Sequence, residues 1–120
     1  MNELLSAPLK SVRDIAERLA RALRETGVFV FDRGLVDQPT VSRLLGVAGV
    51  DQFLTRQTIS DMVVYVIRTD VVEARCRRSV CNEVPPEEAR ACVAECFHKT
   101  LKEMVEVVAK NILEAAESME

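Results

Sequence analysis

Apolar residues recur at every third or fourth position between residues 8 and 25, and this spacing predicts an amphipathic helix. Ser6 is a suitable N-cap, Pro8 suits the first turn, and Gly27 can end the helix. The predicted apolar face comprises Val12, Ile15, Ala16, Leu19 and Leu23.

Two later segments have the pattern of β-strands. Residues 27–33 read GVFVFDR, and successive side chains of a strand point to opposite faces. One face then carries Val28 and Val30, and the other carries Phe29, Phe31 and Arg33. Residues 60–68 read SDMVVYVIR, a nearly continuous apolar run that predicts a buried strand.

Two short helices are predicted between these strands. Asp37 followed by Pro39 opens the first, over residues 38–45, and the sequence GVAG interrupts it at 46–49. The segment VDQFLTRQ, residues 50–57, predicts the second.

A long helix is predicted at the end of the chain. It is preceded by a shorter helix over residues 71–81, for which Asp70 can serve as the N-cap. A short loop then leads to Pro85 and Pro86. Two prolines followed by two glutamates form a strong helix start. No helix breaker follows, so the helix is expected over 85–117, roughly 50 Å at 1.5 Å per residue.

This last helix has heptad character. Its a positions hold His98, Val105, Ile112 and Met119, and its d positions hold Ala94, Leu101, Val108 and Ala115. The helix could lie wholly against its own domain, but its far end would otherwise expose Val108 and Ile112. We therefore predict a homo-oligomer, a dimer or tetramer, whose interface contains Leu101, Val105, Val108 and Ile112. His98 is expected to be a packed or interfacial residue rather than a metal ligand.

These elements together predict an α+β fold, in which a small antiparallel sheet is backed by helices and followed by a long C-terminal zipper-like helix. The expected division is a helix-backed sheet domain over residues 1–80 and an oligomerisation helix over 81–120. A length of 120 residues suffices for a hydrophobic core. No apolar run approaches a membrane span, and the first residues do not resemble a signal peptide, so a cytoplasmic protein without a membrane partner is expected.

Charge is unevenly distributed along the chain. Residues 1–78 hold 12 Lys and Arg against 10 Asp and Glu, whereas residues 79–120 hold 4 against 9. A polyanion would therefore bind the first part. Asn and Gln total only six, a composition typical of proteins from hot habitats.

Four cysteines have the spacing C-x4-C-x10-C-x3-C, at positions 76, 81, 92 and 96. Two antiparallel helices joined by a short loop would allow nested disulfides, Cys76 to Cys96 and Cys81 to Cys92. Free packed thiols or a metal site remain alternatives, although the C-x2-C pairs usual for structural zinc are absent. No cofactor and no metal are expected.

Motifs for catalysis are lacking. The chain has a single histidine, and it contains neither a P-loop nor a dinucleotide-binding glycine motif. We therefore expect a non-enzymatic protein, either a nucleic-acid-binding protein or an oligomeric scaffold with no nucleic-acid activity.

Two modes of nucleic-acid binding compete. Residues 39–57 resemble a helix-turn-helix that would present Thr55, Arg56 and Gln57 to duplex DNA, but the apolar residue expected six positions after Gly46 lies one position late, at Phe53. Alternatively, Phe29 and Phe31 stack on bases while Arg33 contacts phosphate. The remaining candidate contacts are Arg56, Tyr65 and Arg68, with Arg43 at the rim. Because Tyr65 and Arg68 point to opposite faces, at most one of them joins the aromatic pair. The competing interpretation places both Phe rings in the core under the first helix.

The order of parts resembles the ThermoDBP-related proteins of hyperthermophilic archaea. The resemblance rests on the N-terminal helix, the VFVFDRG strand, the LLGV and DQFLTRQT segments, the SDMVVYVIR strand and the zipper-like helix. It implies binding of single-stranded DNA through a small helix-backed sheet, and dimers joined by the C-terminal helix. The partner expected for this chain is single-stranded DNA or RNA. The four cysteines have no assignment from this resemblance.

Overall fold

The computed structural model describes residues 11–119, so the predicted capping residues Ser6 and Pro8 lie outside the described residues. The chain forms two compact units. Unit 1 is built from two segments, one that ends at Ile67 and one that begins at Val105. Unit 2 comprises the residues between them, Arg68–Met104. These limits differ from the expected boundary at residue 80.

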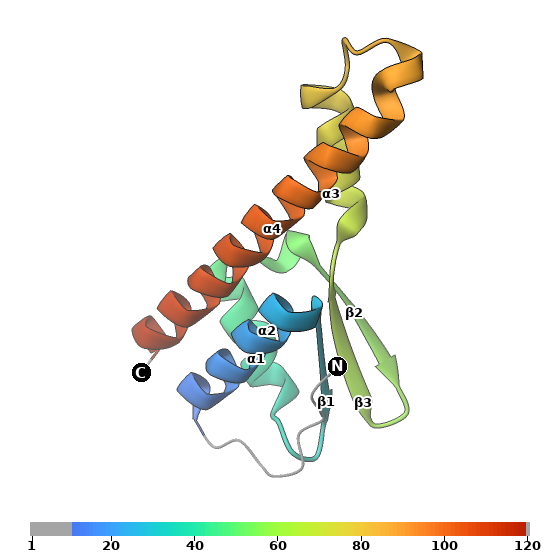
Figure 1. Cartoon of the computed structure of the whole chain (residues 1–120). Helices are drawn as coiled ribbons and strands as arrows, with labels where there is room; N and C mark the ends of the chain where they lie inside the picture. Colours follow the sequence, from blue (N-terminus) through green and yellow to red (C-terminus); the bar gives the residue numbers. More distant parts are fainter. Residues whose placement is uncertain (1–10, 120) are drawn as a thin grey trace. The chain divides into compact units, whose positions relative to one another are not determined.

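Unit 1 contains a three-stranded antiparallel sheet in the order β1-β3-β2 (Figure 1). Its strands are β1 (Val28–Asp32), β2 (Leu54–Ile59) and β3 (Met62–Ile67). Both strands predicted from the sequence are confirmed, as is the α+β class. β2 and β3 form a hairpin whose turn contains Ser60, the one non-glycine residue with a positive φ (57°) among those described.

The segment predicted as the second short helix is a strand instead. Asp51–Phe53 form a single 3-10 turn, and β2 then pairs with β3 along its whole length. The helix-turn-helix interpretation is therefore wrong, because Thr55, Arg56 and Gln57 lie on a strand. Pairing with the strongly apolar β3 has overridden the weak local helix signal.

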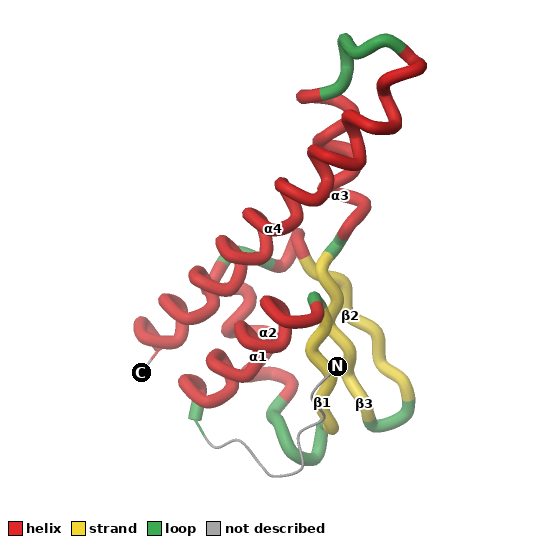
Figure 2. Tube along the Cα trace, viewed as in Figure 1, coloured by secondary structure: helices red, strands yellow, loops and turns green. Residues whose placement is uncertain are grey.

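Two helices cover one face of the sheet (Figure 2). α1 (Val12–Thr26) begins at Ser11, whose hydroxyl accepts a hydrogen bond from the Asp14 amide, and it ends at Gly27 as predicted. α2 (Gln38–Ala48) begins at Asp37 as predicted. It runs through Gly46, however, and ends at Gly49, whose φ of 71° suits glycine. The prediction that GVAG breaks the helix at its first glycine was wrong.

The core of unit 1 lies between these helices and the sheet. Both Phe rings of β1 are buried, together with the alternate residues of β3, Val63, Tyr65 and Ile67. The last turns of α4 (Pro86–Met119) complete this core. Val108 and Ile112 of these turns are 0% exposed within the single chain. The prediction that Val108 and Ile112 would be exposed without an oligomer was therefore wrong. Leu101 and Val105 are half-buried, and their place in a subunit interface stays a prediction.

Unit 2 is a helical hairpin. α3 (Thr69–Arg75) continues into a π-helical turn, Cys76–Val80, and a short loop leads to the first turns of α4. The start of α4 agrees with the prediction. Asp70, by contrast, is not the N-cap of α3, because Arg68 holds that position and no side chain caps the helix.

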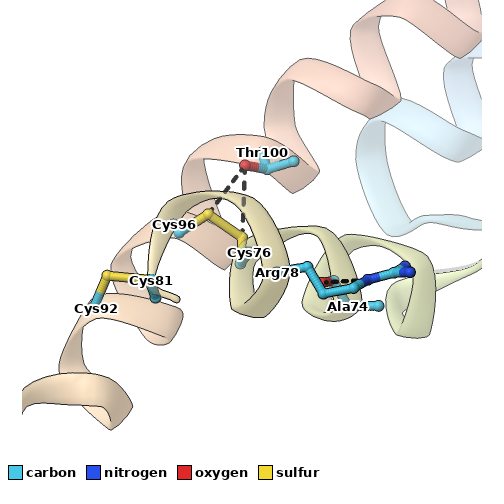
Figure 3. Close-up of a disulfide and its surroundings, with 7 residues drawn as sticks. All are labelled: Ala74, Cys76, Arg78, Cys81, Cys92, Cys96 and Thr100. Carbon is cyan, nitrogen blue, oxygen red and sulfur yellow. Dashed lines mark hydrogen bonds between the residues drawn. A yellow bond between two sulfur atoms is a disulfide. The ribbon is translucent and has the colours of Figure 1, made fainter. Parts of the chain in front are cut away.

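Two nested disulfides join the arms of this hairpin, Cys76–Cys96 and Cys81–Cys92, with the predicted pairing (Figure 3). Their Cα atoms are 5.8 and 6.0 Å apart. The hydroxyl of Thr100 lies 3.8 Å from Sγ of Cys76 and 3.6 Å from Sγ of Cys96, and it is the donor because a disulfide sulfur carries no hydrogen. The prediction of disulfides is confirmed.

Among the described residues, no helix combines the length and the apolar character that a membrane crossing requires.

Candidate nucleic-acid interface

The aromatic residues of β1 do not form a binding platform. Phe29 is 1% exposed and Phe31 is 0% exposed, and their ring centroids are 5.4 Å apart in the core. Phe31 also stacks against Tyr65 at 6.2 Å. The hypothesis that Phe29 and Phe31 stack on bases was therefore wrong, because helices α1 and α2 need an apolar sheet face to pack on and this face supplies it.

Arg33 lies beyond the end of β1, away from this aromatic cluster. Its guanidinium donates to the Ser60 carbonyl at 3.4 Å and lies 3.9 Å from the Asp61 carboxylate, at the β2–β3 turn. Both side chains of this ion pair are at least half exposed, so the pair adds little stability and leaves Arg33 accessible. The structure does not bring Arg33 to a stacked ring.

Arg68 belongs to unit 2 and is paired with a neighbour. Its guanidinium donates to the Asp70 carboxylate at 2.8 and 3.3 Å. This hydrogen bond is the main cause that lowers the pKa of Asp70 below its ordinary value. The positive charge of Arg68 is therefore paired with the negative charge of Asp70 within its own unit.

Arg56 and Tyr65 are brought together by the register of β2 and β3, in which they are direct partners. The two residues line an open groove of about 260 Å³ between α2 and β2. We call it the α2–β2 groove, and its other residues are Ser42, Leu45, Asp51 and Leu54. Gln38 donates from its amide nitrogen to the Tyr65 hydroxyl at 2.9 Å and to the Ser42 hydroxyl at 3.0 Å, which fixes the floor of the groove.

One arginine of this groove is available for a ligand. Arg56 is exposed, and within the described part of the chain it forms no ion pair or hydrogen bond. Arg43 of α2 is also exposed and has no such partner there, but it does not line the groove. In contrast, Arg13 of α1 pairs with Glu17, and Arg24 pairs with Glu106. The groove also contains an unpaired carboxylate, that of Asp51, so it offers both a cation and a hydrogen-bond acceptor.

The strand that borders the groove is polar and accessible. Apart from Leu54, every residue of β2 is exposed, including Thr55, Arg56, Gln57 and Thr58. Among the described residues, β2 pairs with β3 on one side only, so the backbone groups of its other edge have no partner strand within residues 11–119. Arg56 and Tyr65 are the groove residues that the sequence predicts as contacts, whereas Arg43, predicted at the rim, does not line the groove. Asp51 and Leu54 were not predicted, because the pattern of residues 50–57 favours a helix, and no signal in the sequence points to Ser42.

The described residues contain no cluster of three or more metal-ligating side chains. Searches for similar proteins found no matching family model, no matching curated protein and no matching solved structure.

Proposed function

We propose that the protein is a non-enzymatic binding protein for single-stranded nucleic acid, and that the α2–β2 groove and the exposed strand β2 form its contact surface. The observation that carries this proposal is the position of Arg56, an unpaired guanidinium directly opposite Tyr65 at the edge of the sheet. The resemblance in layout to the ThermoDBP-related proteins supports the same assignment.

The chemistry of the groove suits one nucleotide and its phosphate. Arg56 can donate two parallel hydrogen bonds to a phosphate, a geometry that arginine favours. Asp51 can accept a hydrogen bond from an exocyclic amino group, as acidic side chains do with cytosine. The hydroxyl of Ser42 on α2 and that of Thr58, which shares the sheet face of Arg56 on β2, add neutral hydrogen-bonding groups.

The proposed mode differs from stacking on exposed rings. Because the aromatic residues of β1 and β3 are buried, base stacking contributes little, and electrostatic and hydrogen-bond contacts dominate. Arg56 is the one unpaired cation among the described residues that line the groove, so we expect weak binding that strengthens as the salt concentration is lowered.

A salt titration tests the proposal. Fluorescence anisotropy with labelled single-stranded and duplex oligonucleotides should show binding of the single strand at low salt. Replacing Arg56 by Gln should weaken this binding and reduce the slope of log K against log salt by about 0.7, the value for one phosphate contact on a single strand.

Arg13→Gln is the matched control, because it removes the same charge from a guanidinium that pairs with Glu17 outside the groove. Equal losses of single-strand affinity in the two variants would show that binding depends only on the net charge of the protein. That result would contradict the assignment of the groove. Absence of binding by the wild-type protein at low salt would overturn the proposal as a whole.

A further inference from the structure

The hydroxyl groups of Tyr65 and Ser42 are neighbours in the α2–β2 groove. The side-chain nitrogen of Gln38 donates one hydrogen to each of them, at 2.9 and 3.0 Å respectively. Both hydroxyls are therefore acceptors toward Gln38, and each keeps its own proton. Within residues 11–119, neither proton has an acceptor. Two hydrogen-bond donors are thus available to a ligand of the groove.

The orientation of the Gln38 amide decides this polarity. Its carbonyl oxygen, Oε1, is buried and has no hydrogen-bond partner among the described residues. The reverse orientation would let this oxygen accept from both hydroxyls, but it would bury an NH2 group whose two donors have no partner. Two unpaired buried donors cost more than one unpaired acceptor, so the observed orientation is favoured. Gln38 therefore makes the hydroxyls of Tyr65 and Ser42 donors toward the groove.

The carboxylate of Asp51 lies farther along α2. A methyl group added to Gly46 would contact Oδ2 of Asp51 at 3.9 Å, so this carboxylate lies beside the turn of α2 that contains Gly46. Gly46 follows Ser42 by one helical turn, about 6 Å along the axis. Within the described chain, the carboxylate has no ion pair and no hydrogen bond. The groove thus presents an acceptor toward Gly46 and two donors toward Gln38.

This order of groups matches the hydrogen-bonding edge of cytosine. Cytosine carries an amino donor, N4, followed by two acceptors, N3 and O2. The amino group fits Asp51, and the two acceptors fit the hydroxyls of Tyr65 and Ser42. Thymine and uracil carry an oxygen in place of the amino group and an N–H in place of N3, so like groups would face each other. Adenine has the amino group but only one acceptor beside it on this edge.

The remaining lining of the groove suits one planar ring. Leu45 and Leu54, which are 2% and 8% exposed, supply its apolar surface. The volume of about 260 Å³ lies below the range typical of drug-sized ligands, which favours a single-ring base over a purine. Arg56 lines the same groove and provides the phosphate contact. We infer that the α2–β2 groove selects cytosine within a single strand, an inference that rests on the proposed function.

Fluorescence anisotropy with labelled strands of equal length, each built from one base, tests this selectivity at low salt and slightly alkaline pH. The wild type should bind oligo-dC about tenfold more tightly than oligo-dT, with oligo-dA between them. Asp51→Asn should abolish this preference, because an amide can either accept from an amino group or donate to a carbonyl. Asp61→Asn is the matched control, since it removes the same charge from an exposed carboxylate at the β2–β3 turn and should keep the preference.

Two further variants test the donors. Gln38 is a positioning residue, and in Gln38→Glu the carboxylate would accept from both hydroxyls, so the preference for oligo-dC should fall. The ratio of the two affinities is the readout, because a change in net charge affects both strands alike. Tyr65→Phe removes one donor and keeps the buried ring, so it should weaken binding of oligo-dC and leave that of oligo-dT nearly unchanged. Circular dichroism verifies that each variant is folded.

Tyr65 is the only tyrosine of the chain, so a ¹³C-labelled tyrosine gives a single NMR signal from the groove, and this signal should move on addition of oligo-dC. Equal affinity for oligo-dC and oligo-dT, with the loss in Arg56→Gln retained, would overturn the selectivity and leave the proposed function intact. A preference for oligo-dC that survives both Asp51→Asn and Tyr65→Phe would also overturn the inference. Absence of binding to every strand would overturn the inference and the proposed function together.

Discussion

The two units of the chain are stabilised by different means. In unit 1, helices and sheet enclose a core of large apolar side chains, including Phe29, Phe31, Leu19 and Leu44. In unit 2, one core cluster consists of Cys76, Cys81 and Val93, with Val84, Cys92 and Cys96 packed against it. Four of these six residues are the cystines themselves, so covalent bonds replace much of the apolar volume that a larger unit would use.

This difference follows from size. A hairpin of 37 residues, Arg68–Met104, buries too small a fraction of its surface for side-chain packing alone to order it. Small units of this kind are commonly held by disulfides or metals. Unit 1 includes a sheet, two helices and the end of α4, and it needs no cross-link. The two units should therefore respond differently to core truncation and to reduction.

The largest effect is expected from truncating the core of unit 1. Phe31→Ala should lower the free energy of unfolding by about 3–5 kcal/mol, because the ring is fully buried and leaves a cavity. Phe97→Ala is the matched change in unit 2, where the ring is only half-buried, and it should cost far less. Urea denaturation followed by circular dichroism measures both, and equal costs would remove the distinction between the units.

Removing one cystine should have the next largest effect. Replacing Cys81 and Cys92 together by Ser should cost about 2–4 kcal/mol, because the unfolded hairpin regains the entropy that the bond had removed. Limited proteolysis should locate the new cleavage sites in unit 2. Cleavage within the strands of unit 1 would contradict this assignment.

Helix capping gives a smaller test of the same contrast. The Asp37 carboxylate accepts from the Thr40 amide at 3.2 Å and from its hydroxyl at 2.6 Å, whereas α3 of unit 2 has no side-chain cap. Asp37→Ala should therefore lower stability by about 1 kcal/mol. Arg68→Ala, at the N-cap of α3, should leave the melting temperature nearly unchanged, and a comparable drop there would be inconsistent with an uncapped helix.

The smallest effect concerns pH. The hydrogen bond from Arg68 lowers the pKa of Asp70, so the folded state favours the charged carboxylate. Any stabilisation is thus present above the ordinary carboxyl pKa and is lost as pH falls through the lowered value. It is small, because both side chains are more than one third exposed. An NMR titration should find the Asp70 midpoint below its ordinary value, and Arg68→Gln should raise it; an unchanged midpoint in the variant would exclude Arg68 as the cause.

The sequence predicts those elements whose signal is local. The prolines and glutamates at the start of α4, the Gly27 end of α1 and the apolar run of β3 each act within a few residues, and all three are found in the structure. The disulfide pairing could also be predicted, because an antiparallel hairpin restricts which cysteines can meet.

The errors arise where long-range packing decides. Strand β2 has only Leu54 and Ile59 as apolar residues, so no periodicity distinguishes it from a helix, and its pairing with β3 forms the strand. Heptad spacing in α4 shows that Val108 and Ile112 are buried, but it cannot tell a partner helix from the chain's own core. Alternation in β1 likewise separates two apolar faces without showing which one the helices cover. That choice decides whether Phe31 is available for a ligand.

Hydrogen exchange with and without a dithiol reductant tests the contrast between the units most directly. Mass spectrometry first verifies that all four cysteines are reduced. Amides of Thr69–Leu101 should then exchange much faster than in the oxidised protein, while amides of β1, β3 and α1 should keep their protection. Unchanged protection of Thr69–Leu101 in the fully reduced protein would contradict the account, and so would loss of protection in both units together.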